Sequence, residues 1–133
     1  MILVDTSVLI DFFKGNRNKH VSCLKEIITR QMPFGITSVI YQELLQGVRS
    51  KKEYALLDEY LSCQRFFHPK DPVLTYGKAA MIYFSCRKKG ITIRSTVDCL
   101  IAQIAVESDL HLLQNDKDFV NIAQIIELKL YPV

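Results

Sequence analysis

The sequence lacks the motifs that mark several common classes of small protein. Its four cysteines form no C-x-x-C pair and accompany no histidine pattern, so they suggest neither a zinc site nor a disulfide framework. Its five glycines are dispersed, without the G-x-G-x-x-G or P-loop spacing of nucleotide-binding domains. We therefore expect the cysteines to be small buried residues in a reducing compartment.

Targeting and membrane signals are also missing. The N-terminus lacks the basic start and long apolar stretch of a signal peptide, and no later apolar run approaches membrane-spanning length. We predict a soluble, cytoplasmic protein that does not enter a membrane. The net charge of +3 permits a polyanionic partner, but many ordinary domains are equally basic, so charge alone identifies none.

The length and composition predict one domain over residues 1–133, with no repeat or linker. The chain is 49% hydrophobic, which is enough for a core. Short apolar or β-branched runs alternate with helical patterns, which predicts an α/β fold: a three-layer α/β/α arrangement with a mostly parallel central sheet. The strands are expected at residues 2–4, 34–37, 65–67, 111–113 and 124–128.

Amphipathic spacing and capping residues predict seven helices. Ser38, Ser50 and Asp71 are expected to cap three of them, and Pro72 follows the last cap at the first helical position. The helices are expected at about residues 8–13, 19–31, 38–48, 50–63, 71–89, 96–107 and 118–122.

Four acidic residues are predicted to reach one edge of the sheet. In an open α/β sheet, ligands bind beyond the carboxyl ends of the strands. Asp5 directly follows the first strand, and Asp116 follows the strand at residues 111–113. Glu43 and Asp98 fall in the first turns of helices that, if they follow strands, begin at the same edge. The four carboxylates can therefore converge on one spot.

Converging carboxylates repel one another unless a cation neutralises them. A set of oxygen ligands without histidine suits Mg²⁺ or Mn²⁺ better than zinc. Such ions activate water and stabilise charge on a phosphodiester, with one carboxylate available to accept a proton. The predicted reaction is phosphodiester hydrolysis by metal-activated water.

Each acidic residue also has a purely structural interpretation. Asp98 can be the acid of a capping box that starts at Ser95, and Asp5 can be a favourable charge near a helix start. Glu43 can be a solvated helix residue, and Asp116 can form a turn. Their joint placement favours the site over these interpretations.

With these residues, the chain resembles the PIN-domain ribonucleases, most closely the VapC-type toxins of type II toxin–antitoxin systems. The matching segments are residues 4–11 (VDTSVLID), 37–47 (TSVIYQELLQG), 98–102 (DCLIA) with Ala105, and 115–119 (NDKDF). They occur in the order seen in the family and span nearly the whole chain.

The resemblance implies that Asp5, Glu43, Asp98 and Asp116 are the metal-binding and catalytic acids. Thr6, Ser7 and Asn115 would support them, as hydroxyl and amide groups around other metal sites do. Gln114 stands where the resemblance leads us to expect threonine or serine. Asp118 can therefore share or replace the role of Asp116, or it can be the N-cap of the following helix.

The resemblance also implies a homodimer, and a cognate antitoxin that covers the active site with one end and binds operator DNA with the other. The substrate class is a structured RNA with unpaired bases. Lys14 and Arg94 are the candidate phosphate-binding residues, because their loops should lie near the acidic edge. The basic run at residues 87–89 is better explained as a favourable helix C-terminus.

Other functions remain open. A phosphatase with an aspartate nucleophile needs a second aspartate two positions after Asp5, where Ser7 stands. A phosphoacceptor signalling domain would bind Mg²⁺ and phosphorylate one aspartate, with Lys117 as a loose candidate for its lysine. A PIN-like module that binds RNA or protein without cutting it is a third alternative.

Overall fold

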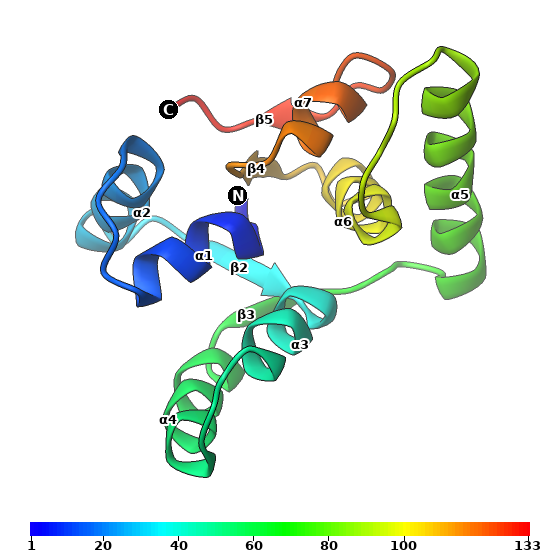
Figure 1. Cartoon of the computed structure of the whole chain (residues 1–133). Helices are drawn as coiled ribbons and strands as arrows, with labels where there is room; N and C mark the ends of the chain where they lie inside the picture. The colour runs from blue at the N-terminus through cyan, green and yellow to red at the C-terminus, as the bar shows by residue number, and fades with distance from the viewer.

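The computed structural model describes all 133 residues, in which five short strands form one sheet (Figure 1). The sheet has the order β3-β2-β1-β4-β5, and every neighbouring pair of strands is parallel. The central strand, β1, is therefore paired on both sides. The strands are β1 (Ile2–Val4), β2 (Phe34–Thr37), β3 (Arg65–Phe67), β4 (His111–Leu113) and β5 (Lys129–Leu130).

Seven helices cover the sheet in two groups. Helix α1 contacts α2 and α3, and α3 contacts α4, whereas α5, α6 and α7 contact one another and form the other group (Figure 1). The strand order runs outward from β1 to β3 and then reverses toward β5, so right-handed crossovers place the two groups on opposite faces. The predicted three-layer α/β/α fold is confirmed. The helices are α1 (Thr6–Phe13), α2 (Lys19–Thr29), α3 (Ser38–Gln46), α4 (Lys51–Ser62), α5 (Pro72–Lys88), α6 (Thr96–Glu107) and α7 (Lys117–Ile122).

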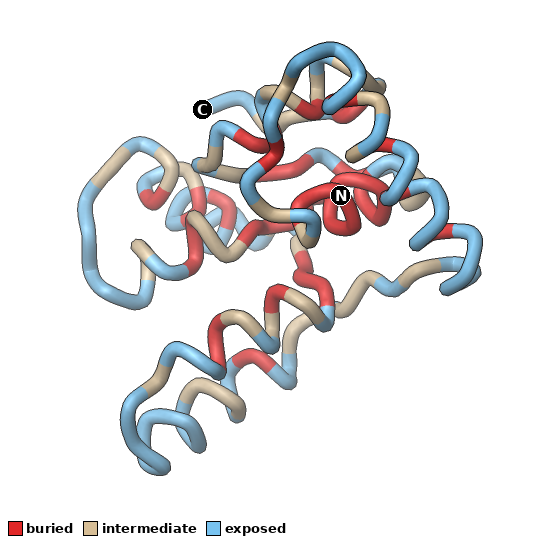
Figure 2. Tube along the Cα trace, turned by 45° about the vertical axis from the view of Figure 1, so that its right-hand side comes forward, coloured by how far each residue is buried: buried red, intermediate tan, exposed pale blue.

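The core lies around β1, β4 and α6. All three residues of β1 are buried, and so are residues 98–105 of α6, which packs between α5, α7 and β4 (Figure 2). A helix that is buried on all sides needs apolar residues around its whole circumference, and α6 has them except at Asp98 and Gln103. Asp98 is thus a carboxylate inside an otherwise apolar buried run.

Polar N-cap residues stabilise the starts of several helices. Ser50 and Asp71 cap α4 and α5 as predicted, by accepting hydrogen bonds from backbone N–H groups of the first turn. The prediction that Ser38 caps α3 is wrong. Thr37 is the cap, because the last residue of β2 is extended and its hydroxyl accepts a hydrogen bond from the N–H of Ile40 at 3.2 Å.

One expected strand is absent, and the condition set for Asp98, a helix that follows a strand, is not met. Residues 124–128 are not a strand: the chain leaves α7 through turns, Ile125 and Ile126 pack against the core, and β5 begins only at Lys129. The apolar run therefore reflects packing and not strand pairing. In addition, α6 follows α5 and no strand. Its first turn still reaches the carboxyl edge, because α6 runs back to the start of β4, opposite to the strands.

The environment of the cysteines matches the expectation in part. Cys86 and Cys99 are buried, Cys23 is half-buried, and all four thiols are free. Cys63 is exposed, against the prediction, because it forms the C-cap of α4 at a free helix end. None of the helices has the length and apolar composition required to cross a bilayer.

Candidate active site

Asp5 lies at the carboxyl end of β1, where it is the N-cap of α1. Its side chain is buried and accepts hydrogen bonds from the N–H of Ser7 at 3.0 Å and from the Ser7 hydroxyl at 2.6 Å. The Ser7 oxygen in turn accepts a hydrogen bond from the backbone N–H of Asn115 at 2.9 Å. Because β1 and β4 are neighbours, Ser7 links the acid after one strand to the loop after the other.

Glu43 approaches the same edge from α3. The hydroxyl of Thr6 donates a hydrogen bond to Glu43 Oε1 at 2.8 Å, so adjacent hydroxyl residues orient the two acids. Burial raises the pKa of Asp5 to about 6; the hydrogen bonds from Ser7 oppose this shift, and the negative charge of Glu43 adds to it. Asp5 and Glu43 therefore form one electrostatic unit.

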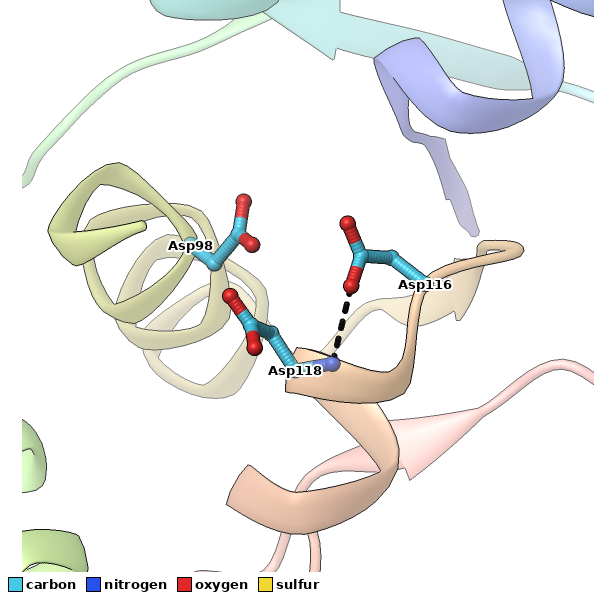
Figure 3. A group of neighbouring side chains, drawn as sticks. All are labelled: Asp98, Asp116 and Asp118. Atoms are coloured by element: carbon cyan, nitrogen blue, oxygen red, sulfur yellow. Dashed lines mark hydrogen bonds between the residues drawn. The ribbon is translucent and has the colours of Figure 1, made fainter. Parts of the chain in front are cut away.

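A second group of acids lies between α6 and α7. Asp98 projects from the first turn of α6, and Asp116 and Asp118 come from the start of α7 (Figure 3). One carboxylate oxygen from each of the three lies within 4.8 Å of the others. The N-cap of α7 is Asp116, which accepts a hydrogen bond from the N–H of Asp118 at 2.9 Å (Figure 3). The interpretation of Asp118 as the helix cap is therefore wrong.

Asp118 instead anchors the loop that precedes α6. Its carboxylate is 2% exposed and accepts hydrogen bonds from the backbone N–H groups of Arg94, at 3.2 and 3.1 Å, and of Ser95, at 3.0 Å. Ser95 is the N-cap residue of α6 but makes no side-chain capping bond, so the alternative capping box from Ser95 to Asp98 is not formed. The carboxylate of Asp98 is free for another role.

One proton is shared within this group. Burial raises the pKa of Asp98 to about 9, and the hydrogen bond to Asp118 and the negative charges of Asp5 and Asp116 act in the same direction. Burial also acts to raise the pKa of Asp118, but the hydrogen bonds from Asp98 and from the backbone outweigh it, and that pKa is lowered. The two neighbouring carboxyl groups thus have opposite pKa shifts, with Asp98 the group that favours its protonated form.

Asp116, the fourth predicted acid, is supported by Gln114, which stands where the family resemblance predicts threonine or serine. Gln114 Oε1 accepts a hydrogen bond from the backbone N–H of Asp116 at 2.7 Å. An amide oxygen is an acceptor, as a threonine or serine hydroxyl oxygen is, so the glutamine supplies the support in another form. The sequence alone did not reveal this contact.

The two candidate phosphate-binding residues have different surroundings. The guanidinium of Arg94 lies over the acids, with Nη2 2.8 Å from Asp116 Oδ1 and Nε 3.6 Å from Asp118 Oδ1. Lys14 is the exposed C-cap of α1 and lines, together with Glu43, a groove between α1, α3 and α4. Both cations therefore lie at the rim of the acidic edge.

The predicted acids form one continuous edge with two parts. Asp98 and Asp116 lie together with Asp118, while Asp5 borders them and acts on Asp98 through its charge. Glu43 lies beyond Asp5 and is not part of the tight group. Asp118, which the sequence offered only as an alternative to Asp116, belongs to the tight group beside it. Its position two residues after Asp116 is the signal in the sequence that points to this.

Comparison with known proteins identifies the family of this fold. The profile of the PIN domain family matches residues 2–125, which is most of the chain. The chain belongs to the PIN domain family. A similar protein, Ribonuclease VapC11 of Mycobacterium tuberculosis, is 27% identical over 130 residues, covering 97% of this chain and 96% of the relative.

Solved structures share this PIN fold. VapBC2 from Rickettsia felis, solved bound to a DNA fragment from its promoter, aligns with a TM-score of 0.71 and 22% identity, covering 98% of each chain. VapBC-1 from nontypeable Haemophilus influenzae aligns with a TM-score of 0.71 and 24% identity, covering 98% of this chain and 97% of that one. At such identities, the likeness establishes the fold.

The acids of this PIN domain fit a divalent cation. The tight group offers only carboxylate oxygens, which hard cations prefer, and the three oxygens are close enough to contact one ion. Without a cation, the buried group must retain a proton on Asp98 to limit its negative charge. A divalent ion would remove this need.

Proposed function

We propose that this PIN domain is a metal-dependent endoribonuclease of the VapC toxin type, which hydrolyses phosphodiester bonds in structured RNA. The observation that carries the proposal is the convergence of carboxylates from separate segments on one sheet edge, three of them within 4.8 Å. A full-length relative that is named a ribonuclease supports the same activity. Residues 1–133 would act as one domain, in the cytoplasm.

Asp5, Glu43, Asp98 and Asp116 are the proposed metal-binding and catalytic acids. A bound Mg²⁺ or Mn²⁺ would activate water and stabilise charge on the phosphodiester. Asp98 must lose its proton to become a full ligand, so its buried position links ion binding to proton release. Asp118 acts as a further ligand or holds the loop before α6 in place.

Hydroxyl and amide groups position these acids. Ser7 fixes the Asp5 carboxylate with two hydrogen bonds, and the N–H of Asn115 holds the Ser7 oxygen in turn. Thr6 fixes Glu43. Partners of this kind set the orientation of metal ligands, so we propose that all three residues are needed for full activity.

RNA would approach across the rim cations. Lys14 lines the groove that Glu43 also lines, and Arg94 contacts Asp116, so a phosphate backbone that crosses the acids would contact both cations. Unpaired bases in a loop can be splayed over such a site, which favours a structured RNA with an exposed loop as the substrate.

The proposed protein partners would use two apolar surfaces. The groove between α1, α3 and α4 is lined by Phe13, Leu44 and Leu57 and also by Glu43, and it suits a segment of a cognate antitoxin. Operator DNA would be bound only through that antitoxin. Helix α5 exposes large apolar side chains, which suits a homodimer interface; these are Val73, Leu74, Tyr76, Met81 and Phe84.

The test is cleavage of a panel of structured RNAs with Mg²⁺, Mn²⁺ or a chelator. The Asp5→Asn variant should abolish cleavage, because it removes the charge while an amide oxygen can still cap α1. Asp71→Asn is the matched control, since it makes the same change at the exposed cap of α5. Its cleavage should equal that of the wild type.

Each outcome has a clear meaning. Metal-dependent cleavage that disappears in Asp5→Asn supports the carboxylate nuclease. Cleavage that survives both the chelator and Asp5→Asn contradicts the proposed site. Absence of cleavage across a broad RNA panel favours a PIN module that binds RNA or protein without cutting it.

A further inference from the structure

Arg94 is the one cationic side chain within ion-pair distance of the three clustered acids. Its Nη2 contacts Asp116 Oδ1 at 2.8 Å, and its Nε lies 3.6 Å from Asp118 Oδ1. The guanidinium therefore occupies the side of Asp116 on which a cation would be attracted. Both an arginine and a metal ion seek the same carboxylate charge.

The two ends of Arg94 are held very differently. Its backbone N–H is fixed by both oxygens of the buried Asp118 carboxylate. Its side chain is 69% exposed and has only one short contact with an acid. A pair that exposed is weak, because solvent competes with it. The residue is therefore anchored at its backbone while its charged end is free to leave.

The contact also weakens Asp116 as a ligand. Asp116 Oδ1 already accepts two hydrogen bonds, one from Arg94 and one from the N–H of Asp118. The second bond belongs to the cap of α7 and is retained whenever that helix is formed. Only the bond from Arg94 can be exchanged without disturbing the fold.

We infer that Arg94 is a resident counter-cation of the acidic site, which competes with the divalent ion for Asp116 and swings away from it when the ion binds. This inference rests on the proposed metal-dependent function and adds a regulatory step to it. Release of the guanidinium at the rim gives Arg94 the freedom that contact with an RNA phosphate requires. The same cation thus neutralises the acids without the metal ion and contacts an RNA phosphate once the ion is bound.

The primary experiment is a calorimetric titration of Mn²⁺ into chelator-treated, full-length protein without RNA. Arg94→Gln should bind Mn²⁺ about three- to fivefold more tightly than the wild type, since it loses a competitor whose exposed ion pair is weak. Lys88→Gln is the matched control, because it removes the same charge from an exposed position at the end of α5. Its affinity for Mn²⁺ should stay within the error of the wild-type value.

A second measurement follows the arginine itself. The Nε–H signal of Arg94 in nitrogen-15 NMR spectra should shift on addition of Mg²⁺, and the shift should be absent in Asp116→Asn. The guanidinium signal of Arg87, in the last turn of α5, should not change. If the Arg94 signal does not shift on addition of Mg²⁺ although calorimetry detects binding of Mn²⁺, the inference is overturned.

The failure of this inference differs from the failure of the proposed function. If the wild type binds Mn²⁺ and Arg94→Gln binds it equally or less tightly, Arg94 does not compete with the ion, but the metal site stands. If neither the wild type nor Arg94→Gln binds Mn²⁺, both the inference and the metal-dependent function are wrong.

Discussion

At one end of the acidic edge, hydroxyl groups hold Asp5 and Glu43, whereas at the other end backbone N–H groups, an arginine and a shared proton hold Asp98, Asp116 and Asp118. The first arrangement orients charged carboxylates. The second compensates excess negative charge. One edge therefore combines a preorganised half with a half that must change its protonation and ion pairing when a cation binds.

The largest expected effect comes from removing the protonated acid. Asp98→Asn should reduce RNA cleavage by more than about 100-fold, since even the hydrogen-bond partners of metal ligands are worth about 10–100-fold. In chelator at neutral pH the variant should be at least as stable as the wild type, because the amide N–H can donate to Asp118 as the carboxyl proton does and asparagine takes up no proton on folding. Cleavage assays and thermal melts test the two parts. A variant that unfolds would show that Asp98 is mainly structural.

The hydroxyl-supported half is probed by Ser7→Ala and Thr6→Val. Each variant keeps the acid but removes the group that orients it, so cleavage should fall by about 10–100-fold while Mn²⁺ binding weakens. Ser22→Ala, at an exposed position of α2, is the control and should retain full activity. Full activity in Ser7→Ala would mean that Asp5 needs no hydroxyl support.

In the group of Asp98, Asp116 and Asp118, the substitution Asp118→Asn should lower the free energy of unfolding. One amide oxygen cannot replace two carboxylate oxygens that accept backbone N–H bonds from Arg94 and Ser95, and an unsatisfied buried donor costs about 1–3 kcal/mol. Urea unfolding monitored by circular dichroism measures the loss. Asp116→Asn should lower the free energy of unfolding by less, since asparagine also caps helices. Equal losses would mean that Asp118 does not anchor the loop.

The metal-free protein should also lose stability as the pH rises. Folding raises the pKa of Asp5 to about 6 and that of Asp98 to about 9, so the folded state binds more protons than the unfolded state above about pH 4. In chelator, the free energy of unfolding should therefore fall from pH 5 to pH 8, by at most about 1.4 kcal/mol per pH unit for each titrating proton.

Two comparisons check this pH dependence. Asp98→Asn should flatten the part of the curve above pH 6, and saturating Mg²⁺ should reverse the fall, because the ion favours the deprotonated acids. The lowered pKa of Asp118 acts only in acid, where its stabilising contribution is lost as the pH falls. Stability that rises from pH 6 to pH 8 in chelator would contradict the assigned protonation of Asp98.

Local patterns were sufficient for most of the fold. The apolar run before Asp5, the caps at Ser50 and Asp71, and the alternation of strand and helix patterns predicted the parallel three-layer architecture. Such signals depend on residues within one or two turns of each other. The apolar run at residues 124–128 wrongly predicted a strand, because its apolar residues pack against the core from a turn. The segment that pairs with β4 is β5, and strand pairing is a property of the tertiary structure.

The sequence by itself determined which acids stand after the strands, because Asp5 directly follows the buried run of β1 and Asp116 lies three residues after the end of β4. Only the tertiary structure decided how the acids are grouped. It brought Asp98 to the edge on a helix that follows no strand, placed Asp118 beneath the loop of Arg94, and set the protonation of the group. Burial and charge interactions depend on segments far apart in the chain, so no local pattern specifies them.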